Sequence, residues 1–248
     1  MKKRNEKSSE IVVGLDIGTT KIAVIVGQKN ENGKLDILGY GNCPSHGVKR
    51  GVIINIYKTI ESIINAIQAA EESSDIKITN VFVGIAGQHI KTVRQRFSIM
   101  RDNTNNEISQ KDISKLNENV EKMSLEPGDF IIHMIPQEYI VDGNYVRDDE
   151  NGNNGAIGMP GAKLEADFNI VIGQTAAKLN IEKCIQRANL QYENIILEPL
   201  ASAYSVLSKE EIEAGVVLVD IGGGTTDITI FKDSILRYIA VIPSGGNI

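Results

Sequence analysis

The sequence has 248 residues, 42% of them hydrophobic, and a formal net charge of −6 from 26 Lys and Arg against 32 Asp and Glu. This composition excludes a disordered chain, and the negative charge argues against a nucleic-acid binder and against attraction to an acidic membrane surface. No apolar run reaches the roughly 20 residues of a membrane-spanning helix. The two cysteines and three histidines form neither a disulfide framework nor a zinc-ligand pattern. The basic start lacks the apolar stretch of a signal peptide, so we expect a soluble, cytoplasmic protein.

The first part of the chain predicts a sheet with one long helix. After a polar tail over residues 1–10, short apolar runs alternate with turn residues, which is typical of strands. Asn55 is suited to cap a helix because isoleucines recur on one helical face after it. We expect that face in the core: Ile56, Ile60, Ile63, Ile64 and Ile67. The predicted strands of this part are residues 11–16, 22–27, 34–41 and 81–86.

The segment from about residue 85 to 173 differs in character, being rich in strands with one main helix. Ser109 and Asp112 form a capping-box pattern at the start of that helix, and Glu126-Pro127-Gly128 is expected to end it. Residues 148–161, rich in Gly and Asn, predict an exposed loop. The predicted strands are residues 130–135, 138–141 and 164–172. We interpret the segment as a small module inserted into the surrounding unit.

The last part returns to alternating helices and strands. A helix is predicted from Asn180, and its apolar face includes Cys184, so this thiol is expected in the core rather than as a reactive group. A further helix starts near Pro199, which suits a first helical turn. The predicted strands are residues 194–197, 216–220 and 228–231.

One short pattern occurs twice. Asp16-Ile17-Gly18-Thr19-Thr20-Lys21-Ile22 resembles Asp220-Ile221-Gly222-Gly223-Gly224-Thr225-Thr226-Asp227-Ile228. Each copy follows an apolar strand that ends in Asp, and each leads into a second strand. Glycines let a backbone approach a phosphate closely, successive N–H groups can converge on an anion, and Thr hydroxyls add donors. The pair therefore predicts two hairpins that hold the phosphates of a nucleotide, with the strand-end carboxylates holding Mg²⁺ through its waters.

Other nucleotide motifs are not found. The sequence contains neither the P-loop pattern nor the Gly-x-Gly-x-x-Gly dinucleotide fingerprint. Glu198, in the segment Glu198-Pro199-Leu200-Ala201-Ser202-Ala203, has two interpretations. It can orient a water against a phosphate, or it can be an acid favoured at a helix start by the helix dipole.

These residues resemble the actin-like ATPase superfamily, and within it the FtsA family of bacterial cell-division proteins. The two Asp-Ile-Gly hairpins resemble its phosphate motifs, and Leu197 to Ser205 resembles its connecting motif. The stretch Val83-Gly84-Ile85-Ala86-Gly87-Gln88-His89-Ile90 and the inserted module point to FtsA. The resemblance covers about residues 10–248. It implies an α/β fold of the actin-like (ribonuclease H-like) type with an inserted small α+β module of the 1C or SHS2 type.

The resemblance also implies a division of the chain into subdomains. Subdomain 1A would comprise residues 11–84 and 174–206, module 1C residues 85–173, and the start of subdomain 2A residues 207–248. The family pattern continues past Ile248 into subdomain 2B and a C-terminal amphipathic helix. The chain is therefore expected to be an N-terminal part of such a protein, with its second lobe incomplete.

Site residues follow from the resemblance, motif by motif. Asp16 and Asp220 would hold Mg²⁺, and Glu198 would orient a water in what is at most a weak Mg-dependent ATPase. The residues expected to contact ATP are Asp16, Gly18, Thr19, Thr20, Lys21, Asp220, Gly222, Gly223, Gly224, Thr225, Thr226, Asp227, Gly245 and Gly246.

The function implied is that of an adaptor. It would link FtsZ, through subdomain 2B, to the inner face of the cell membrane at the division site, assemble into filaments, and contact later division proteins through module 1C. No nucleic-acid partner is expected. The alternatives are a chaperone-like ATPase, a sugar kinase, or a pilus or shell assembly ATPase of the same superfamily. A kinase would need a substrate base, and a chaperone would need a peptide-binding domain downstream.

Overall fold

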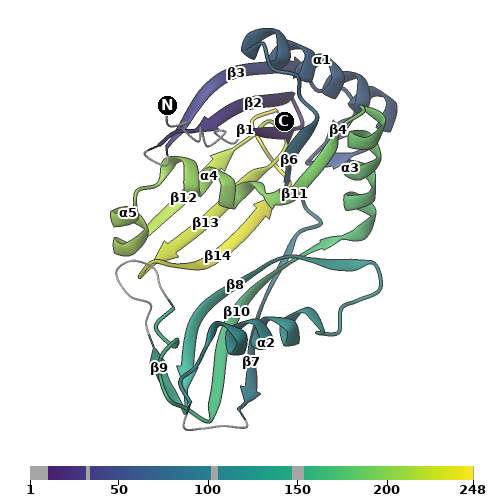
Figure 1. The fold of residues 1–248 in the computed structure, drawn as a ribbon. Helices are drawn as coiled ribbons and strands as arrows, with labels where there is room; N and C mark the ends of the chain where they lie inside the picture. Colours follow the sequence, from purple (N-terminus) through teal and green to yellow (C-terminus); the bar gives the residue numbers. More distant parts are fainter. Residues whose placement is uncertain (1–10, 32–33, 102–105, 147–153, 248) are drawn as a thin grey trace, which may run out of the picture.

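A computed structural model describes residues 11–31, 34–101, 106–146 and 154–247. The predicted N-terminal tail and the first part of the predicted Gly- and Asn-rich loop lie outside the described residues. The described chain forms three main sheets, each packed against helices (Figure 1).

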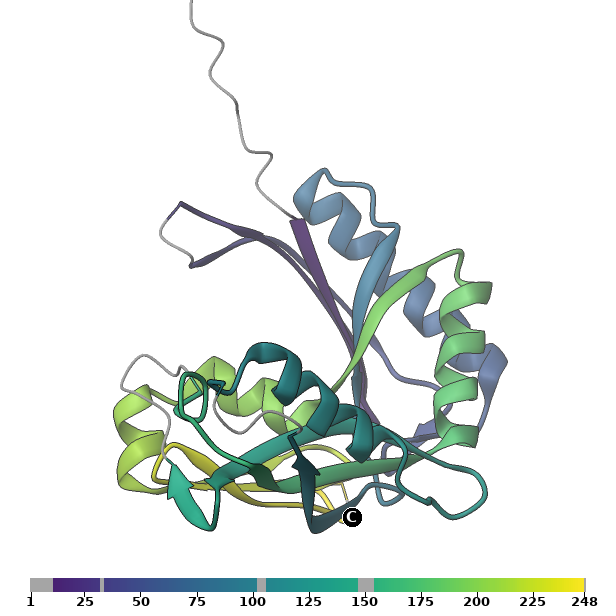
Figure 2. The same ribbon diagram turned by 60° about the horizontal axis from the view of Figure 1, so that its bottom comes forward.

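The first sheet has five strands and contains both strands of the first predicted hairpin. Its strand order is β11-β6-β1-β2-β3, in which β1, β2 and β3 form an antiparallel meander while β6 and β11 run parallel to β1. Helices α1 and α3 cover one face of the sheet (Figure 2). The elements are β1 (Ile11–Ile17), β2 (Lys21–Lys29), β3 (Leu35–Pro44), α1 (Ile56–Ser74), β6 (Asn80–Ile85), α3 (Thr175–Arg187) and β11 (Gln191–Leu197); the short pair β4 (Val48–Lys49) and β5 (Val52–Ile53) lies between β3 and α1.

Helix α1 confirms most of the isoleucine pattern. Oδ1 of Asn55 accepts the N–H of Lys58 at 3.1 Å, as a helix cap should. Ile63 and Ile67 are buried in the first core. The prediction was wrong for Ile64, which is 43% exposed, because it follows Ile63 by about 100° around the helix and points away from the sheet.

Helix α3 starts earlier than predicted. It begins at Thr175, directly after the preceding strand, and not at Asn180. The Thr175 N–H donates to the carbonyl of Gly128 at 2.7 Å. A carbonyl distant in sequence thus satisfies an N–H at the helix start that a capping side chain would otherwise satisfy. Cys184 is fully buried in the first core, as expected, and burial raises the pKa of its thiol to about 11. The thiol is therefore protonated and unreactive at neutral pH.

The second sheet belongs to the segment that differs in composition. Its four strands are all antiparallel, in the order β7-β10-β8-β9. Helix α2 covers one face and closes a separate core around Leu116, Leu164 and Phe168. The capping box of Ser109 and Asp112 is present. The elements are β7 (Lys91–Met100), α2 (Gln110–Glu121), β8 (Asp129–Val141), β9 (Asn144–Val146) and β10 (Lys163–Gln174).

This region shows two corrections to the predicted elements. The strands predicted at 130–135 and 138–141 are one strand, β8, because Pro136 lies exposed beside a register shift and does not interrupt the pairing. Helix α2 ends at Glu121, before the predicted Glu126-Pro127-Gly128 stop.

The third sheet contains the second predicted hairpin. Strands β12 (Val216–Ile221), β13 (Thr226–Lys232) and β14 (Ile235–Ile242) pair antiparallel in that order, and helices α4 (Glu198–Val206) and α5 (Lys209–Ala214) precede them. A third core joins this sheet to α4, the end of β11 and strand β10 of the second sheet. Its buried members are Val171, Leu197, Leu200, Ala203, Phe231, Leu236 and Ile239. The third sheet thus lies against the module, as Figure 2 shows.

Candidate functional site

The first turn of the repeated pattern joins β1 to β2. Asp16 lies near the end of β1, where it pairs with Ala23 of β2. Gly18 is required for close approach, because a Cβ there would lie 2.8 Å from the carbonyl oxygen of Lys21. Oγ1 of Thr19 accepts the N–H of Gly51 at 3.1 Å. This bond fixes the turn against the segment between β4 and β5.

The second turn joins β12 to β13 and is supported by the end of the chain. The N–H of Gly222 donates to the carbonyl of Thr225 at 2.9 Å, and the N–H of Gly246 donates to the carbonyl of Gly222 at 2.9 Å. Thr226 Oγ1 donates to the carbonyl of Ser244 at 2.8 Å. A Cβ on Gly245 would lie 2.4 Å from the Gly222 oxygen, so only glycine fits there. The late glycine pair therefore lies along the second turn.

The two turns meet. A Cβ on Gly223 would contact the side chain of Thr20, and a Cβ on Gly224 would lie 2.7 Å from Cγ2 of Thr19. Residues that lie about two hundred positions apart in the sequence are thus neighbours, and the glycines of one turn leave space for the threonines of the other. Lys21 lies outside the turn itself, as the exposed first residue of β2.

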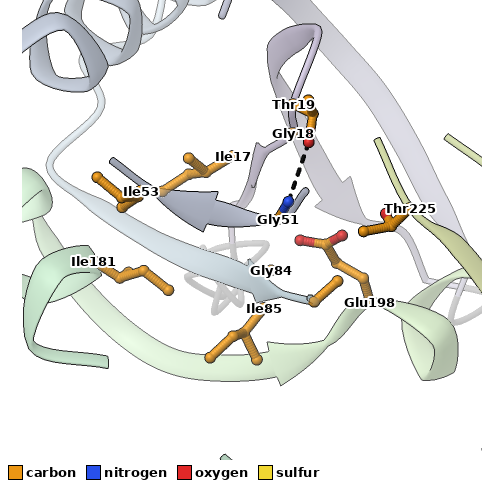
Figure 3. Close-up of a pocket in the computed structure, with 11 residues that line it drawn as sticks. Ile17, Gly18, Thr19, Gly51, Ile53, Gly84, Ile85, Ile181, Glu198 and Thr225 are labelled. Carbon is orange, nitrogen blue, oxygen red and sulfur yellow. Dashed lines mark hydrogen bonds between the residues drawn. The ribbon is translucent and has the colours of Figure 1, made fainter. Parts of the chain in front are cut away.

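A pocket lies beside this meeting point (Figure 3). It is lined by both turns, through Gly18, Thr19 and Thr225, and by Glu198 at the start of α4. Its empty volume is about 380 Å³, counting open solvent. The Glu198 carboxylate points into the pocket between Gly51 and Thr225 (Figure 3). Gly84 makes this possible, because a Cβ at that position would lie 2.8 Å from Cγ of Glu198.

Four carboxylates interact at the site: Asp16, Glu198, Asp220 and Asp227. Burial raises the pKa of Glu198 well above its usual range, and the charges of Asp16, Asp227 and Asp220 add to this. Burial, together with Asp220 and Asp16, raises the pKa of Asp227 to about 7. Burial also raises the pKa of Asp16, against the opposing charge of Lys21. The excess of negative charge favours binding of a cation.

Two of these carboxylates differ in their partners. Ser202 Oγ donates to Oδ2 of Asp220 at 2.9 Å, which fixes that carboxylate against α4. Asp227 is 6% exposed, and its Oδ1 is buried without a hydrogen-bond partner within the described part of the chain. Such an atom calls for a proton, a water or a cation.

The donor set fits Mg²⁺ and a phosphate group in chemistry. Mg²⁺ prefers oxygen ligands and keeps several of its waters, so two strand-end carboxylates suffice. No group of three or more His, Cys, Asp or Glu within the described ranges is arranged to hold a metal ion directly. The arrangement therefore suits an ion held through water, with glycine N–H and threonine hydroxyl donors for the anion.

The structure also adds residues that the sequence did not single out for the site. Gly51 and Gly84 line the pocket, Ser202 holds Asp220, and Ser244 accepts from the second turn. Gly84 and Ser202 fall in stretches that carried the family resemblance, but their roles depend on contacts between distant segments. No local sequence pattern predicts those contacts.

Comparisons with known proteins find relatives along nearly the whole chain. A family model described as the SHS2 domain inserted in FtsA matches residues 87–172. The cell division protein FtsA of Pseudomonas aeruginosa is 40% identical over 242 residues, which are 97% of this chain and 56% of that protein. FtsA of Escherichia coli is 33% identical over 96% of this chain and 55% of the relative, and FtsA of Bacillus subtilis is 34% identical over 96% and 53%. The chain spans a little more than half the length of these curated relatives.

A solved structure shows the same fold at low identity. In the PilM–PilN type IV pilus biogenesis complex, one chain matches 95% of this chain and 62% of its own length, with a TM-score of 0.65 and 11% identity. The fold is the actin-like ATPase fold with an inserted SHS2 module. Within the described residues, no helix is both long and apolar enough to cross a membrane.

Proposed function

Since the chain belongs to the FtsA family of cell-division proteins, of whose length it spans a little more than half, we propose that it binds Mg-ATP between its two Asp-Ile-Gly hairpins and acts in cell division as an actin-like protein. The observation that carries the proposal is the meeting of the two turns beside four carboxylates. An ordinary structural hairpin would not need a second copy opposite it.

The residues divide the work by their chemistry. Asp16 and Asp220 hold the Mg²⁺ through its waters, and the ion neutralises charge on the phosphates. The phosphates contact the first turn through Gly18, Thr19, Thr20 and Lys21, and the second turn through Gly222 to Thr226. Gly245 and Gly246 support the second turn from behind, as their contact with Gly222 requires.

Glu198 is suited to orient water but poorly suited to take a proton from it. Burial and the charges of the neighbouring acids raise the pKa of Glu198, which favours its protonated form. A protonated carboxyl donates a hydrogen bond and is not a base. We propose that hydrolysis is weak, since a carboxyl held in its protonated form is a poor base, and that nucleotide binding, more than turnover, sets the state of the protein.

The wider role follows the family. We propose that the whole protein links FtsZ to the membrane at the inner face of the division site and assembles into filaments, with FtsZ and membrane contacts made by parts that the longer relatives have outside the matched region. The inserted module would contact other copies and later division proteins. Another actin-like ATPase, such as a chaperone-like ATPase, a sugar kinase or a pilus or shell assembly protein, is the alternative. The fold alone fits all of these.

Calorimetric titration with ATP, with and without Mg²⁺, tests the nucleotide proposal. Asp220→Asn removes an ion-holding charge, so we expect the affinity for Mg-ATP to fall about tenfold or more. Glu121→Gln, an exposed acid at the end of α2, is the matched control and should bind as the wild type does. Equal affinity of the wild type and Asp220→Asn would contradict the assignment of the site.

A further inference from the structure

The inserted module touches the candidate site through a histidine. Strand β8 passes the end of β11, and the backbone N–H of Leu197 donates to Nε2 of His133 at 3.1 Å. A ring nitrogen accepts only when it carries no proton, so the ring proton lies on Nδ1. Burial lowers the pKa of His133, which keeps the ring neutral at neutral pH.

A β-bulge turns His133 toward the site. The register between β8 and β10 shifts where Val171 pairs with His133 and Ile172 pairs with Ile131, so Ile132 is an extra residue in β8. Ile131 and Met134 pack against the core of the module, whereas Ile132 packs against the first and third cores. Two successive residues thus face out of the module, as a bulge allows. Bulges next to functional sites commonly re-aim a side chain in this way.

The donor of this bond lies at the start of the helix that carries the site. Leu197 is the N-cap residue of α4, and Glu198 is its first residue. One turn further on, Ser202 donates to Asp220. Helix α4 therefore connects the bond from the module with Glu198, which it carries, and with Asp220, which Ser202 holds.

The module is also fixed to the second hairpin. Nδ2 of Asn169, on β10, donates to the carbonyl of Leu236 on β14 at 2.8 Å, and this bond is buried. Asn169 lies on the same face of the module sheet as His133, because Asn169 pairs with Ile135 and Val171 pairs with His133. One face of the module therefore contacts both halves of the site.

From these contacts we propose that His133 is a positioning residue for nucleotide binding. By accepting the Leu197 N–H, it fixes the start of α4 and with it the Glu198 carboxylate and the Ser202 hydroxyl that holds Asp220. The inference rests on the proposed function, since it assigns the module a part in holding Mg-ATP.

Two substitutions distinguish the effect of losing the hydrogen-bond acceptor from the effect of losing the packing of the ring. His133→Gln can place an amide oxygen near the position of Nε2, whereas the shorter His133→Asn places it near the position of Nδ1, out of reach of Leu197. We expect the dissociation constant for Mg-ATP to stay within about threefold in His133→Gln and to rise about tenfold in His133→Asn. Rescue by the longer amide is a result that loss of packing alone would not give.

Amide hydrogen exchange of the ligand-free chain tests the bond between His133 and the Leu197 N–H in the absence of nucleotide. His133→Asn should speed exchange of the Leu197 amide and the first turn of α4 about tenfold, and His133→Gln should restore protection. Leu116→Ala is the control: Leu116 is fully buried in the module core, so its loss destabilises the module without touching β11. It should leave both exchange at Leu197 and Mg-ATP affinity unchanged.

The outcomes distinguish this inference from the proposed function. Wild-type protection at Leu197 in His133→Asn would overturn the positioning role, as would an equal loss of affinity in Leu116→Ala. If the wild-type chain binds no Mg-ATP, the proposed function fails. Exchange at Leu197 then still decides whether His133 positions α4.

Discussion

The two hairpins share a sequence pattern but have different surroundings. Ile17 and Ile221 occupy equivalent places, directly after the aspartate of each copy. Ile17 is 7% exposed in the core of a five-stranded sheet covered by helices, whereas Ile221 is 68% exposed on an edge strand of the third sheet. The repeated pattern thus specifies the turn and its glycines, while the rest of the chain decides how firmly the turn is held.

The pattern also diverges at its last polar position. Lys21 in the first copy is exposed and lowers the pKa of Asp16, whereas Asp227 in the second copy is buried among other acids. The first hairpin therefore supplies a positive charge, and the second adds a negative one. The proposed ligand, a phosphate with Mg²⁺, would use both kinds of group.

The largest difference should appear in stability. We expect Ile17→Ala to lower the free energy of unfolding by about 3 kcal/mol, because it removes buried methyl groups and leaves a cavity. Ile221→Ala should change it by less than about 0.5 kcal/mol, since the side chain is already in water. Urea denaturation of both variants measures the comparison. Equal effects would mean that the two hairpins are equally packed.

The next effect depends on pH. The folded pKa of Asp227, about 7, lies above its unfolded value of about 3.9, so ionisation of this carboxylate destabilises the fold. The cost is absent below about pH 4, grows as the pH rises to about 7, and is constant above that. Asp227→Asn should therefore raise the free energy of unfolding by about 2 kcal/mol at pH 8, after allowance for solvent screening, and by almost nothing at pH 4.

Lys21→Met is the matched control for that measurement, since it changes the equivalent position of the first hairpin. It should give no comparable gain at pH 8, because Lys21 is an exposed cation and not a buried acid. Stabilisation by Asp227→Asn that is equal at both pH values would contradict the raised pKa of Asp227.

The smallest effect concerns the bond that holds Asp220. Ser202→Ala removes a hydroxyl donor from a carboxylate that keeps contact with water, so the free energy of unfolding should fall by only about 0.5 kcal/mol. The affinity for Mg-ATP should fall by less than in Asp220→Asn. Ser205→Ala, which loses a hydroxyl bonded to its own helix backbone, serves as control. An effect of Ser202→Ala larger than that of Asp220→Asn would place the important contact elsewhere.

Local patterns predicted the elements whose signals are local. The apolar runs that end in Asp16 and Asp220 became strands, and Asn55 and Ser109 cap the helices that were expected after them. The identification of both turns needed only the repeat and the chemistry of glycine and threonine. Their meeting at Thr19, Thr20, Gly223 and Gly224 is a fact of tertiary structure that the repeat alone suggested but did not determine.

Elements held by distant contacts were missed or misplaced. Residues Lys91 to Arg96 of strand β7 are all exposed and, apart from Val93, polar, so the sequence shows no alternation. Among the described strands β7 pairs with β10 alone. The start of α3 depends on the Gly128 carbonyl, and the continuity of β8 through Pro136 depends on its pairing with β10. The sequence did not single out His133 either, because its hydrogen-bond partner, Leu197, is distant in sequence.

The measurement that tests the central proposal most directly is hydrogen exchange of the wild-type chain with and without Mg-ATP. If the nucleotide is held by both hairpins, residues 17–21 and 221–226 should both gain protection when Mg-ATP is added. ATP without Mg²⁺ should protect both much less. Protection of only one turn, or none at saturating Mg-ATP, would contradict a site formed by the two hairpins together.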